Sequence, residues 1–376
     1  MTHAAGPDLM ALHHTVNFVY IQYLRGIAAI LVVYFHTKVY MPSFQWSLSR
    51  AIGYSGVDIF FTISGFIMIV TNHHRVDTIK DFLIKRALRI YPIYWIATLM
   101  VLLVFFLVPS HTSKESIDFI YILSSLTLIP MENASGTSGG VPFLKIAWTL
   151  VFEVFFYVIF ALTLIFRYER IRIYALVLAM AAFVSFGQLS NPTSATLRFY
   201  TNPLIIEFIF GCIAGYIVMN KCPNLSHKVF IALIFVCVTC LALGGGRGNG
   251  FARTFWFGCP AAVIVFLCAS TELVHGARFR SKILRQIGDA SYSIYLFHPF
   301  CLVGFRIIAD KIQLNVASPF IGGAAIVMSI LTAIGVGVLA HLWLERPCLL
   351  MSKRLLRWMA MYHEGRNAGR PRGVTS

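Results

Sequence analysis

Residues 23–36 read YLRGIAAILVVYFH, an apolar run with an arginine and a histidine near its two ends. The surrounding stretch, 19–40, has the length at which a helix crosses a bilayer, about 17–25 mostly apolar residues. Similar runs recur throughout the 376-residue chain, which is 58% hydrophobic and 12% charged, with a mean hydropathy of +0.76. Soluble domains average about 45–50% apolar and about 25% charged residues. The composition therefore predicts an all-α polytopic membrane protein whose apolar surface faces lipid.

We predict about ten transmembrane helices, because ten apolar runs are long enough to span a membrane. They lie at about 19–40, 52–72, 90–108, 146–166, 172–189, 202–219, 229–245, 254–271, 289–308 and 319–344. The segment 117–130 (IDFIYILSSLTLIP) is apolar but short. We interpret it as a half-buried or interfacial helix on the outer side. Loops are predicted at 132–140, as a flexible segment, and at 244–250, where glycine and small polar residues gather.

The basic residues indicate which side of the membrane holds the termini. With ten spans both termini lie on one side, and 21 of the 31 Lys and Arg residues fall there, against nine on the other. Because basic residues gather in cytoplasmic loops, both termini are predicted to be cytoplasmic. The net charge of +16 would suggest nucleic acid in a soluble protein. Membrane topology explains that charge here, so we expect no nucleic-acid partner.

The chain is predicted to be one membrane domain with two short ends. A cytoplasmic N-terminal segment covers 1–17, the transmembrane domain covers 18–348, and a basic cytoplasmic tail covers 349–376. The tail is expected to lie on the membrane surface or to be disordered. We expect no cleavable signal peptide, no appended soluble domain and no metal site. Cys237 and Cys240 form a C-x-x-C inside an apolar run, where they are interpreted as ordinary small helix residues.

Ionisable residues inside the predicted spans are the main functional candidates, because a charge in hydrocarbon is expensive. Arg25 and His36 are eleven residues apart, so a helix projects both from one face, about 16 Å apart along its axis. Alternatively, Arg25 reaches the lipid headgroups and His36 is an interfacial residue. Arg86 and Arg89 lie one turn apart at the start of the third span. Their guanidinium groups suit phosphate oxygens, or they simply anchor the helix at the cytoplasmic surface.

Further ionisable residues lie in the later spans. Glu153 is surrounded by Phe and Val, so it must face a polar interior or pair with a cation, with a structural salt bridge as the alternative. Asp58 lies near the outer end of the second span, and His298 lies among aromatic residues. Glu345 and Arg346 end the last span and are expected to pair locally or to stop the span.

Six segments follow one another over about residues 18–348: YLRGIAAILVVYFH, GVDIFFTISGF, KRALRIYPIYW, WTLVFEVFFY, SYSIYLFHPF and WLERP. Together, and in this order, they resemble the acyltransferase-3 family of integral membrane acyltransferases. The opening segment is most similar to the exopolysaccharide-modifying (ExoZ-like) branch. The resemblance implies transfer of an acyl group, usually acetyl, from cytoplasmic acyl-CoA to a hydroxyl of a cell-surface or lipid-linked glycan. It also implies the inner membrane of a bacterium and the possible company of polysaccharide-assembly proteins.

The resemblance also implies roles for particular residues. Arg25 and His36 match the family's Arg-x10-His pair, and Arg86 and Arg89 match its Arg-x-x-Arg pair. Trp148 and Glu153 match a W-S-L-x-x-E pattern in which Thr149 replaces the serine.

We predict His36 as general base, because a histidine can take a proton from a sugar hydroxyl near neutral pH. Glu153 or Asp58 is expected to orient it, as a carboxylate does in a catalytic triad. Arg86 and Arg89, assisted by Arg25, are expected to bind the donor phosphates. Trp148 and His298 are predicted to contact substrate. Two rival functions remain open at this point: a transporter or flippase for a glycan lipid, and a non-catalytic subunit of a polysaccharide-assembly complex.

Overall fold

The computed structural model describes residues 18–40, 50–73, 77–107, 118–244, 250–315 and 318–368, and within these ranges it contains helices and loops but no strand. Nine helical segments in these ranges are long and apolar enough to cross a membrane, and the shorter apolar helix His227–Leu243 is a tenth candidate. The prediction of an all-α polytopic membrane protein with about ten spans is therefore confirmed.

Most helices follow the predicted spans, but the third begins at Ile79, before the predicted start at 90, so Arg86 and Arg89 lie within this helix and not at its start. The helices are α1 (Val19–Tyr40), α2 (Arg50–Asn72), α3 (Ile79–Leu107), α4 (Phe119–Thr127), α5 (Trp148–Thr163), α6 (Glu169–Ser190), α7 (Ala195–Tyr200), α8 (Ile206–Lys221), α9 (His227–Leu243), α10 (Gly250–Arg253), α11 (Cys259–His275), α12 (Lys282–Asp289), α13 (Ser291–Lys311), α14 (Pro319–Ala340) and α15 (Arg346–Ala368). Four short turns join them: the 3-10 turns η3 (Lys145–Ala147) and η4 (Pro203–Ile205), and the π-helical turns η5 (Thr254–Gly258) and η6 (His341–Glu345).

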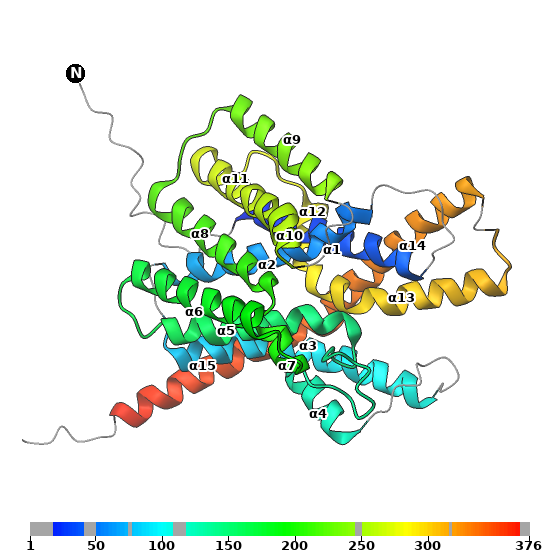
Figure 1. Cartoon of the computed structure of the whole chain (residues 1–376), viewed down its shortest axis with the longest axis horizontal. Coiled ribbons are helices and arrows are strands. Elements are labelled where there is room, and N and C mark those ends of the chain that lie inside the picture. Colours follow the sequence, from blue (N-terminus) through cyan, green and yellow to red (C-terminus); the bar gives the residue numbers. More distant parts are fainter. Residues whose placement is uncertain are drawn as a thin grey trace, which may run out of the picture.

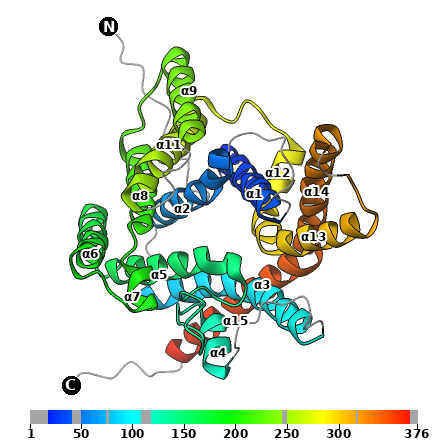
Figure 2. The ribbon, with the colours of Figure 1, turned by 45° about the vertical axis from the view of Figure 1, so that its right-hand side comes forward.

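Helices α1 and α2 lie side by side in the middle of the molecule (Figures 1 and 2). On one side, α8, α9 and α11 pack together, and α8 and α11 contact α2. On the other side lie α3, α5 and α15, while α13 and α14 form a hairpin whose helices also contact α1. Functional residues predicted on α1, α2, α3, α5 and α13 can therefore meet near the centre.

The contact between α2 and α8 is unusually close. A Cβ atom added at Gly65 would lie 2.0 Å from the Phe208 carbonyl oxygen, and one added at Gly211 would lie 1.9 Å from the Thr62 carbonyl oxygen. Small residues let the backbones of membrane helices approach in this way, which strengthens packing where lipid offers no hydrophobic driving force. These glycines fix the position of α2, which carries the predicted site residue Asp58 and also Ser64, a partner of Glu153.

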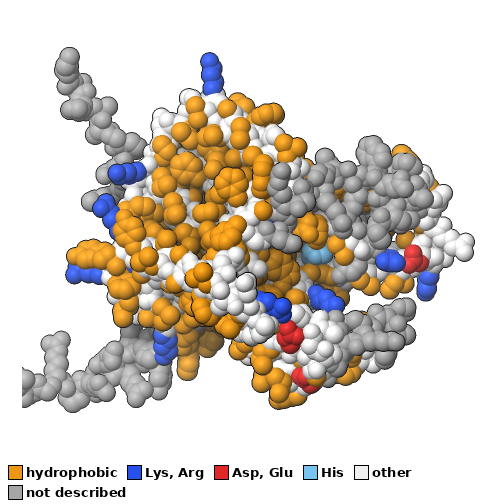
Figure 3. All heavy atoms as spheres, in the orientation of Figure 1, with side chains coloured by type: hydrophobic (Ala, Val, Ile, Leu, Met, Phe, Trp, Pro, Cys, Tyr) orange, Lys and Arg blue, Asp and Glu red, His pale blue; other side chains and the backbone are white. Residues whose placement is uncertain are grey.

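The outer surface is largely apolar. Exposed leucine, isoleucine, valine and phenylalanine side chains cover much of the face in Figure 3. Lys and Arg side chains lie at its left margin and also at the top, the lower centre and the right. Such a surface suits a bilayer flanked by basic ends. The orientation of the termini remains a prediction, and residues 1–17, 245–249 and 369–376 lie outside the described residues.

One short helix agrees with the sequence prediction, and one loop differs from it. Helix α4 is nine residues long, too short to span, as expected, and Asp118 caps it by accepting a hydrogen bond from the Tyr121 N–H. The segment 132–140 has no helix, but the Asn133 side chain binds the N–H groups of Thr137 and Ser138, so it holds a defined conformation.

The last span does not stop where the sequence indicated. In η6 the Arg346 N–H donates to the His341 carbonyl, five residues earlier, and the chain continues as α15. Pro347 has no N–H to donate, and a π-helical turn directly before it shifts the hydrogen-bond pattern so that the helix passes through. The predicted boundary at 348/349 consequently lies inside a helix.

Candidate active site

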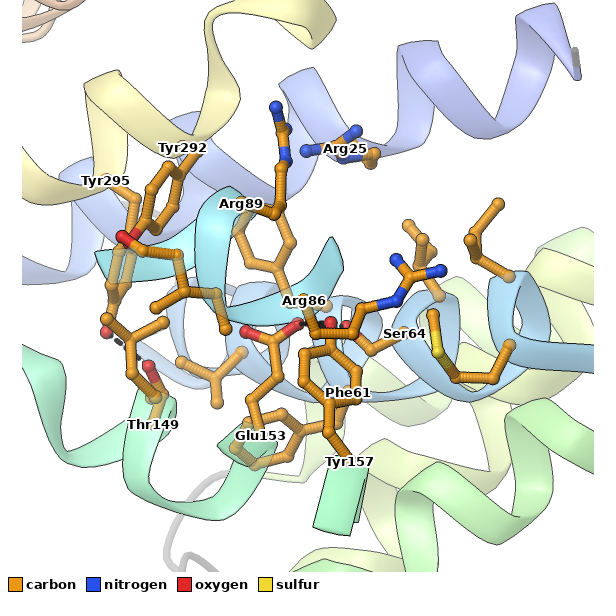
Figure 4. A pocket seen from close by; sticks show the side chains of 17 residues that line it. Arg25, Phe61, Ser64, Arg86, Arg89, Thr149, Glu153, Tyr157, Tyr292 and Tyr295 are labelled. Carbon is orange, nitrogen blue, oxygen red and sulfur yellow. Dashed lines mark hydrogen bonds between the residues drawn. The ribbon is translucent and has the colours of Figure 1, made fainter. Parts of the chain in front are cut away.

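A cavity of about 140 Å³ lies where α1, α2, α3, α5 and α13 meet. Its polar lining includes Arg25, Ser64, Arg86, Arg89, Thr149, Glu153, Tyr157, Tyr292 and Tyr295 (Figure 4). The structure thus brings together four predicted site residues from three helices: Arg25, Arg86, Arg89 and Glu153. The cavity is smaller than the roughly 300–1,000 Å³ of pockets that enclose a drug-sized ligand, so it would receive only part of a larger one.

The arginines give this cavity an excess of positive charge. The Arg86 guanidinium lies over the rings of Phe82 and Tyr157, at 5.3 and 5.6 Å from their centroids. Its buried Nε has no hydrogen-bond partner among the described residues. An unpaired buried donor costs about 1–3 kcal/mol, so this guanidinium is available to a ligand with acceptor oxygens. A planar fork of donors favours carboxylate or phosphate oxygens.

Glu153 is held by two hydroxyl groups. Ser64 Oγ donates to its Oε1 at 2.8 Å, and Tyr157 Oη donates to the same oxygen at 2.5 Å. Tyr157 lies four residues after Glu153 on α5, a spacing that places both side chains on one helix face. The charge of this carboxylate lies among the arginines of the cavity, and its hydrogen bonds are to Ser64 and Tyr157 rather than to His36.

Arg89 pairs with Glu345, a buried residue that we had expected to pair locally or to stop the last span. Its Nη1 lies 3.1 Å from Oε1 of Glu345, whose side chain is fully buried. Oε2 of Glu345 accepts from Ser293 at 2.7 Å and lies 2.9 Å from His341 Nδ1. The expectation that Glu345 pairs locally with Arg346 is therefore wrong. A buried carboxylate needs partners, and here α13 and η6 supply hydrogen bonds to Oε2 while α3 supplies an ion pair to Oε1.

His36 and His298 lie against each other, with ring centroids 4.8 Å apart. His36 Nδ1 lies 2.9 Å from the carbonyl oxygen of Val32 on the same helix. A carbonyl oxygen only accepts hydrogen bonds, so Nδ1 must carry the hydrogen, and Nε2 is the basic nitrogen of this ring. His36 does not line the cavity of Arg25, although both residues come from the α1 face that meets α13.

Asp58 and Trp148 belong to a separate buried cluster. The two carboxylate oxygens of Asp58 accept from Arg253 Nε and Nη2 at 3.0 and 3.1 Å. The Arg253 guanidinium also lies 5.3 Å from the Tyr54 ring centroid and 5.9 Å from that of Trp148. Asp58 is therefore engaged by an arginine, not by His36. Glu207 is fully buried in α8, and its carboxyl oxygens have no hydrogen-bond partner in the described part of the chain.

Sequence reasoning missed Ser64, Tyr157, Arg253 and the role of Glu345. Tyr157 had a usable signal, because it follows Glu153 at a spacing of four within an apolar helix. No sequence signal pointed to Arg253, because it follows a glycine-rich segment that is typical of a loop. Its partner, Asp58, is 195 residues away in the sequence.

Fold and site together define a polytopic membrane protein with half-buried arginines beside a carboxylate and, along the same helices, a pair of histidines. The chain belongs to the acyltransferase-3 family: the family model, described as an acyltransferase domain, matches residues 18–340. The protein is an acyltransferase, and its predicted membership of this family is confirmed.

Several curated relatives share most of the chain. It is 32% identical to the exopolysaccharide production protein ExoZ of Rhizobium meliloti, over 79% of this chain and 90% of ExoZ. It is 26% identical to the putative membrane-bound transacylase BcsY of Komagataeibacter xylinus, over 73% of this chain and 70% of BcsY. The peptidoglycan O-acetyltransferase OatA of Listeria monocytogenes is 24% identical over 73% of this chain, which spans 48% of OatA. No solved structure matches the chain.

Proposed function

We propose that this acyltransferase moves an acyl group, with acetyl as the expected group, from cytoplasmic acyl-CoA to a hydroxyl of a cell-surface or lipid-linked polysaccharide. The observation that carries the proposal is the gathering of Arg25, Arg86 and Arg89 around one cavity beside Glu153. Acyl-CoA carries several phosphate groups, and guanidinium groups bind phosphate oxygens in charge-assisted pairs. The similarity to ExoZ supports a polysaccharide acceptor, and a bacterial inner membrane is the location that joins such a donor to such an acceptor.

In the proposed reaction the acceptor oxygen attacks the carbonyl carbon of the thioester, and the carbon–sulfur bond breaks. The hydroxyl proton passes to His36 Nε2 and then to the leaving thiolate, so the products are an ester and a free thiol. His36 suits this role because Val32 keeps the hydrogen on Nδ1. Glu153 holds Ser64 and Tyr157 in the cavity wall and balances part of the arginine charge.

The test uses purified protein in lipid nanodiscs with radioactive acetyl-CoA and a membrane extract as the source of acceptor. Wild-type protein is expected to label the glycan fraction and to unfold at a higher temperature with the donor, since a ligand at 100 times its Kd adds about 2.7 kcal/mol of stability. His36→Ala should slow transfer by about 10²–10⁴-fold, the usual contribution of a general base. It should leave the donor-induced stabilisation intact.

Variants of the arginines separate donor binding from chemistry. Arg89→Ala should raise the KM for acetyl-CoA, whereas Arg278→Ala, an exposed arginine between α11 and α12, should change neither KM nor kcat. Unchanged donor affinity in Arg89→Ala, or normal transfer by a well-folded His36→Ala protein, would contradict the proposal.

A flippase or transporter for a glycan lipid is the competing function. Such a protein has no need of acyl-CoA, so acetyl-CoA would not stabilise it and no acetyl group would be transferred. Translocation of a glycan lipid by the protein reconstituted into liposomes without acetyl-CoA would favour that alternative. Comparing the O-acetyl groups on surface glycans of a deletion strain and its parent by NMR would then identify the acceptor.

A further inference from the structure

A proline in α13 leaves one carbonyl group of this helix without its usual donor. In an α-helix the N–H of each residue donates to the carbonyl four residues earlier. Pro299 has no N–H, so the Tyr295 carbonyl receives no hydrogen bond from that position. His298 Nδ1 lies 2.7 Å from this same oxygen. The imidazole therefore supplies the donor that the proline removes.

This contact fixes the tautomer of His298. Because a carbonyl oxygen only accepts, the hydrogen must be on Nδ1, and Nε2 is left with a lone pair. His298 is completely buried, and Nε2 has no hydrogen-bond partner among the residues that the structure describes. A buried acceptor without a donor is destabilising. Such a nitrogen fits a ligand that brings its own hydrogen, as a hydroxyl group does.

The neighbouring ring is the proposed general base, held in the same tautomer by a carbonyl of its own helix. The rings of His36 and His298 have centroids 4.8 Å apart and an interplanar angle of 52°, which allows nitrogens at their edges to come within hydrogen-bonding range of one proton. Two imidazoles that both present Nε2 lone pairs form a pair of acceptors on one side of the bundle.

This inference rests on the proposed function. We propose that His298 is a second catalytic proton acceptor beside His36. Pro299 acts through the Tyr295 carbonyl as a positioning residue for His298. The proton leaving the attacking hydroxyl is held between Nε2 of His36 and Nε2 of His298. It then moves to the sulfur of the thiolate as the carbon–sulfur bond breaks, so both imidazoles end neutral. A charge-assisted hydrogen bond between the rings stabilises the imidazolium that forms meanwhile.

Three variants test this arrangement in membrane vesicles supplied with radioactive acetyl-CoA over a range of concentrations. His298→Ala should lower the maximal rate by about 10²-fold, at the lower end of a general-base effect, with the KM for acetyl-CoA unchanged. Pro299→Ala restores an N–H for the Tyr295 carbonyl and releases His298, so it should lower the rate by about 10-fold while leaving the helix folded. The double variant should be no slower than His298→Ala alone, because Pro299 acts only through that ring.

His275→Ala, at the end of α11, serves as the matched control and should keep the wild-type rate. Full activity of His298→Ala while His36→Ala is inactive would overturn this inference and leave the proposed function standing. Additive losses in the double variant would also overturn it, because they would mean that Pro299 acts on the helix and not on His298. If wild-type vesicles transfer no acetyl group, the proposed function itself fails.

Discussion

The close approach of α2 and α8 makes a sharp prediction for Gly211. An added Cβ atom at this position would lie 1.9 Å from the Thr62 carbonyl oxygen, and ordinary van der Waals contact begins near 3.4 Å. Replacing Gly211 by alanine therefore forces the two helices apart by about 1.5 Å at this point. Neither atom can turn away, since one is fixed to the α8 backbone and the other is part of the α2 backbone.

The size of the effect follows from what surrounds the contact. Overpacking a filled core usually costs about 1–3 kcal/mol. A clash between two backbones has no side chain that can rotate, so we expect Gly211→Ala to lose at least about 2 kcal/mol. Phe61 stacks on Phe208 across the same interface, at a centroid distance of 4.6 Å, and this contact would open as well.

Thermal unfolding in detergent, followed by tryptophan fluorescence, measures this loss. Gly211→Ala is expected to unfold several degrees below the wild type. Gly335→Ala is the matched control, because an added Cβ at Gly335 meets nothing within 4 Å. It replaces a helix-interior glycine with a better helix former, so its stability should be equal or higher. Equal unfolding temperatures for the Gly211 and Gly335 variants would refute the reasoning.

Two buried ion pairs give further predictions, measured by the same unfolding assay. Arg253→Met should cost about 3–5 kcal/mol by leaving the Asp58 carboxylate buried and unpaired, and adding Asp58→Asn should recover part of that loss. Recovery would not occur if the arginine mattered only for packing on Tyr54 and Trp148. Glu345→Ala should lower the free energy of unfolding by about 3 kcal/mol, the low end of the range for breaking a buried ion pair, because the Arg89 side chain is 31% exposed. Glu345→Gln should lower it less, because the glutamine keeps a hydrogen bond from Ser293.

The spans could be predicted from the sequence because hydropathy and length constrain a membrane helix strongly. The end of the last span could not, because the local hydrogen-bond shift in η6 carries the helix through Pro347. The α2–α8 contact did leave a signal: residues 211–215 read GCIAG, a G-x-x-x-G pattern typical of closely packed membrane helices. The pattern does not say which helix lies opposite, and only the fold supplies α2.

The candidate site was predictable where its residues share a helix face or match a family motif. Arg25, Arg86 and Arg89, which were expected to act together, line one cavity. Glu153 lines the same cavity, although it was considered as a residue that orients His36. The partner of each charge was not predictable, because pairing depends on distances between helices that are remote in sequence. Asp58 was one of two carboxylates considered as partners of His36, yet it binds Arg253 of the short helix α10.

Helix α13 connects the arginine cavity to the histidine pair. The Tyr295 side chain lines the cavity and binds Thr149 Oγ1 at 2.7 Å, while its carbonyl oxygen holds His298. Along α1, Arg25 and His36 are separated by eleven residues, a rise of about 16 Å. A donor whose phosphates lie near Arg25 and whose acyl carbon reaches His36 must therefore carry that carbon on a long arm. An acyl phosphate keeps its acyl group directly on the phosphate and cannot reach both places, whereas the thioester of acyl-CoA ends a flexible chain. The distance between these two residues thus favours acyl-CoA over small activated acyl donors.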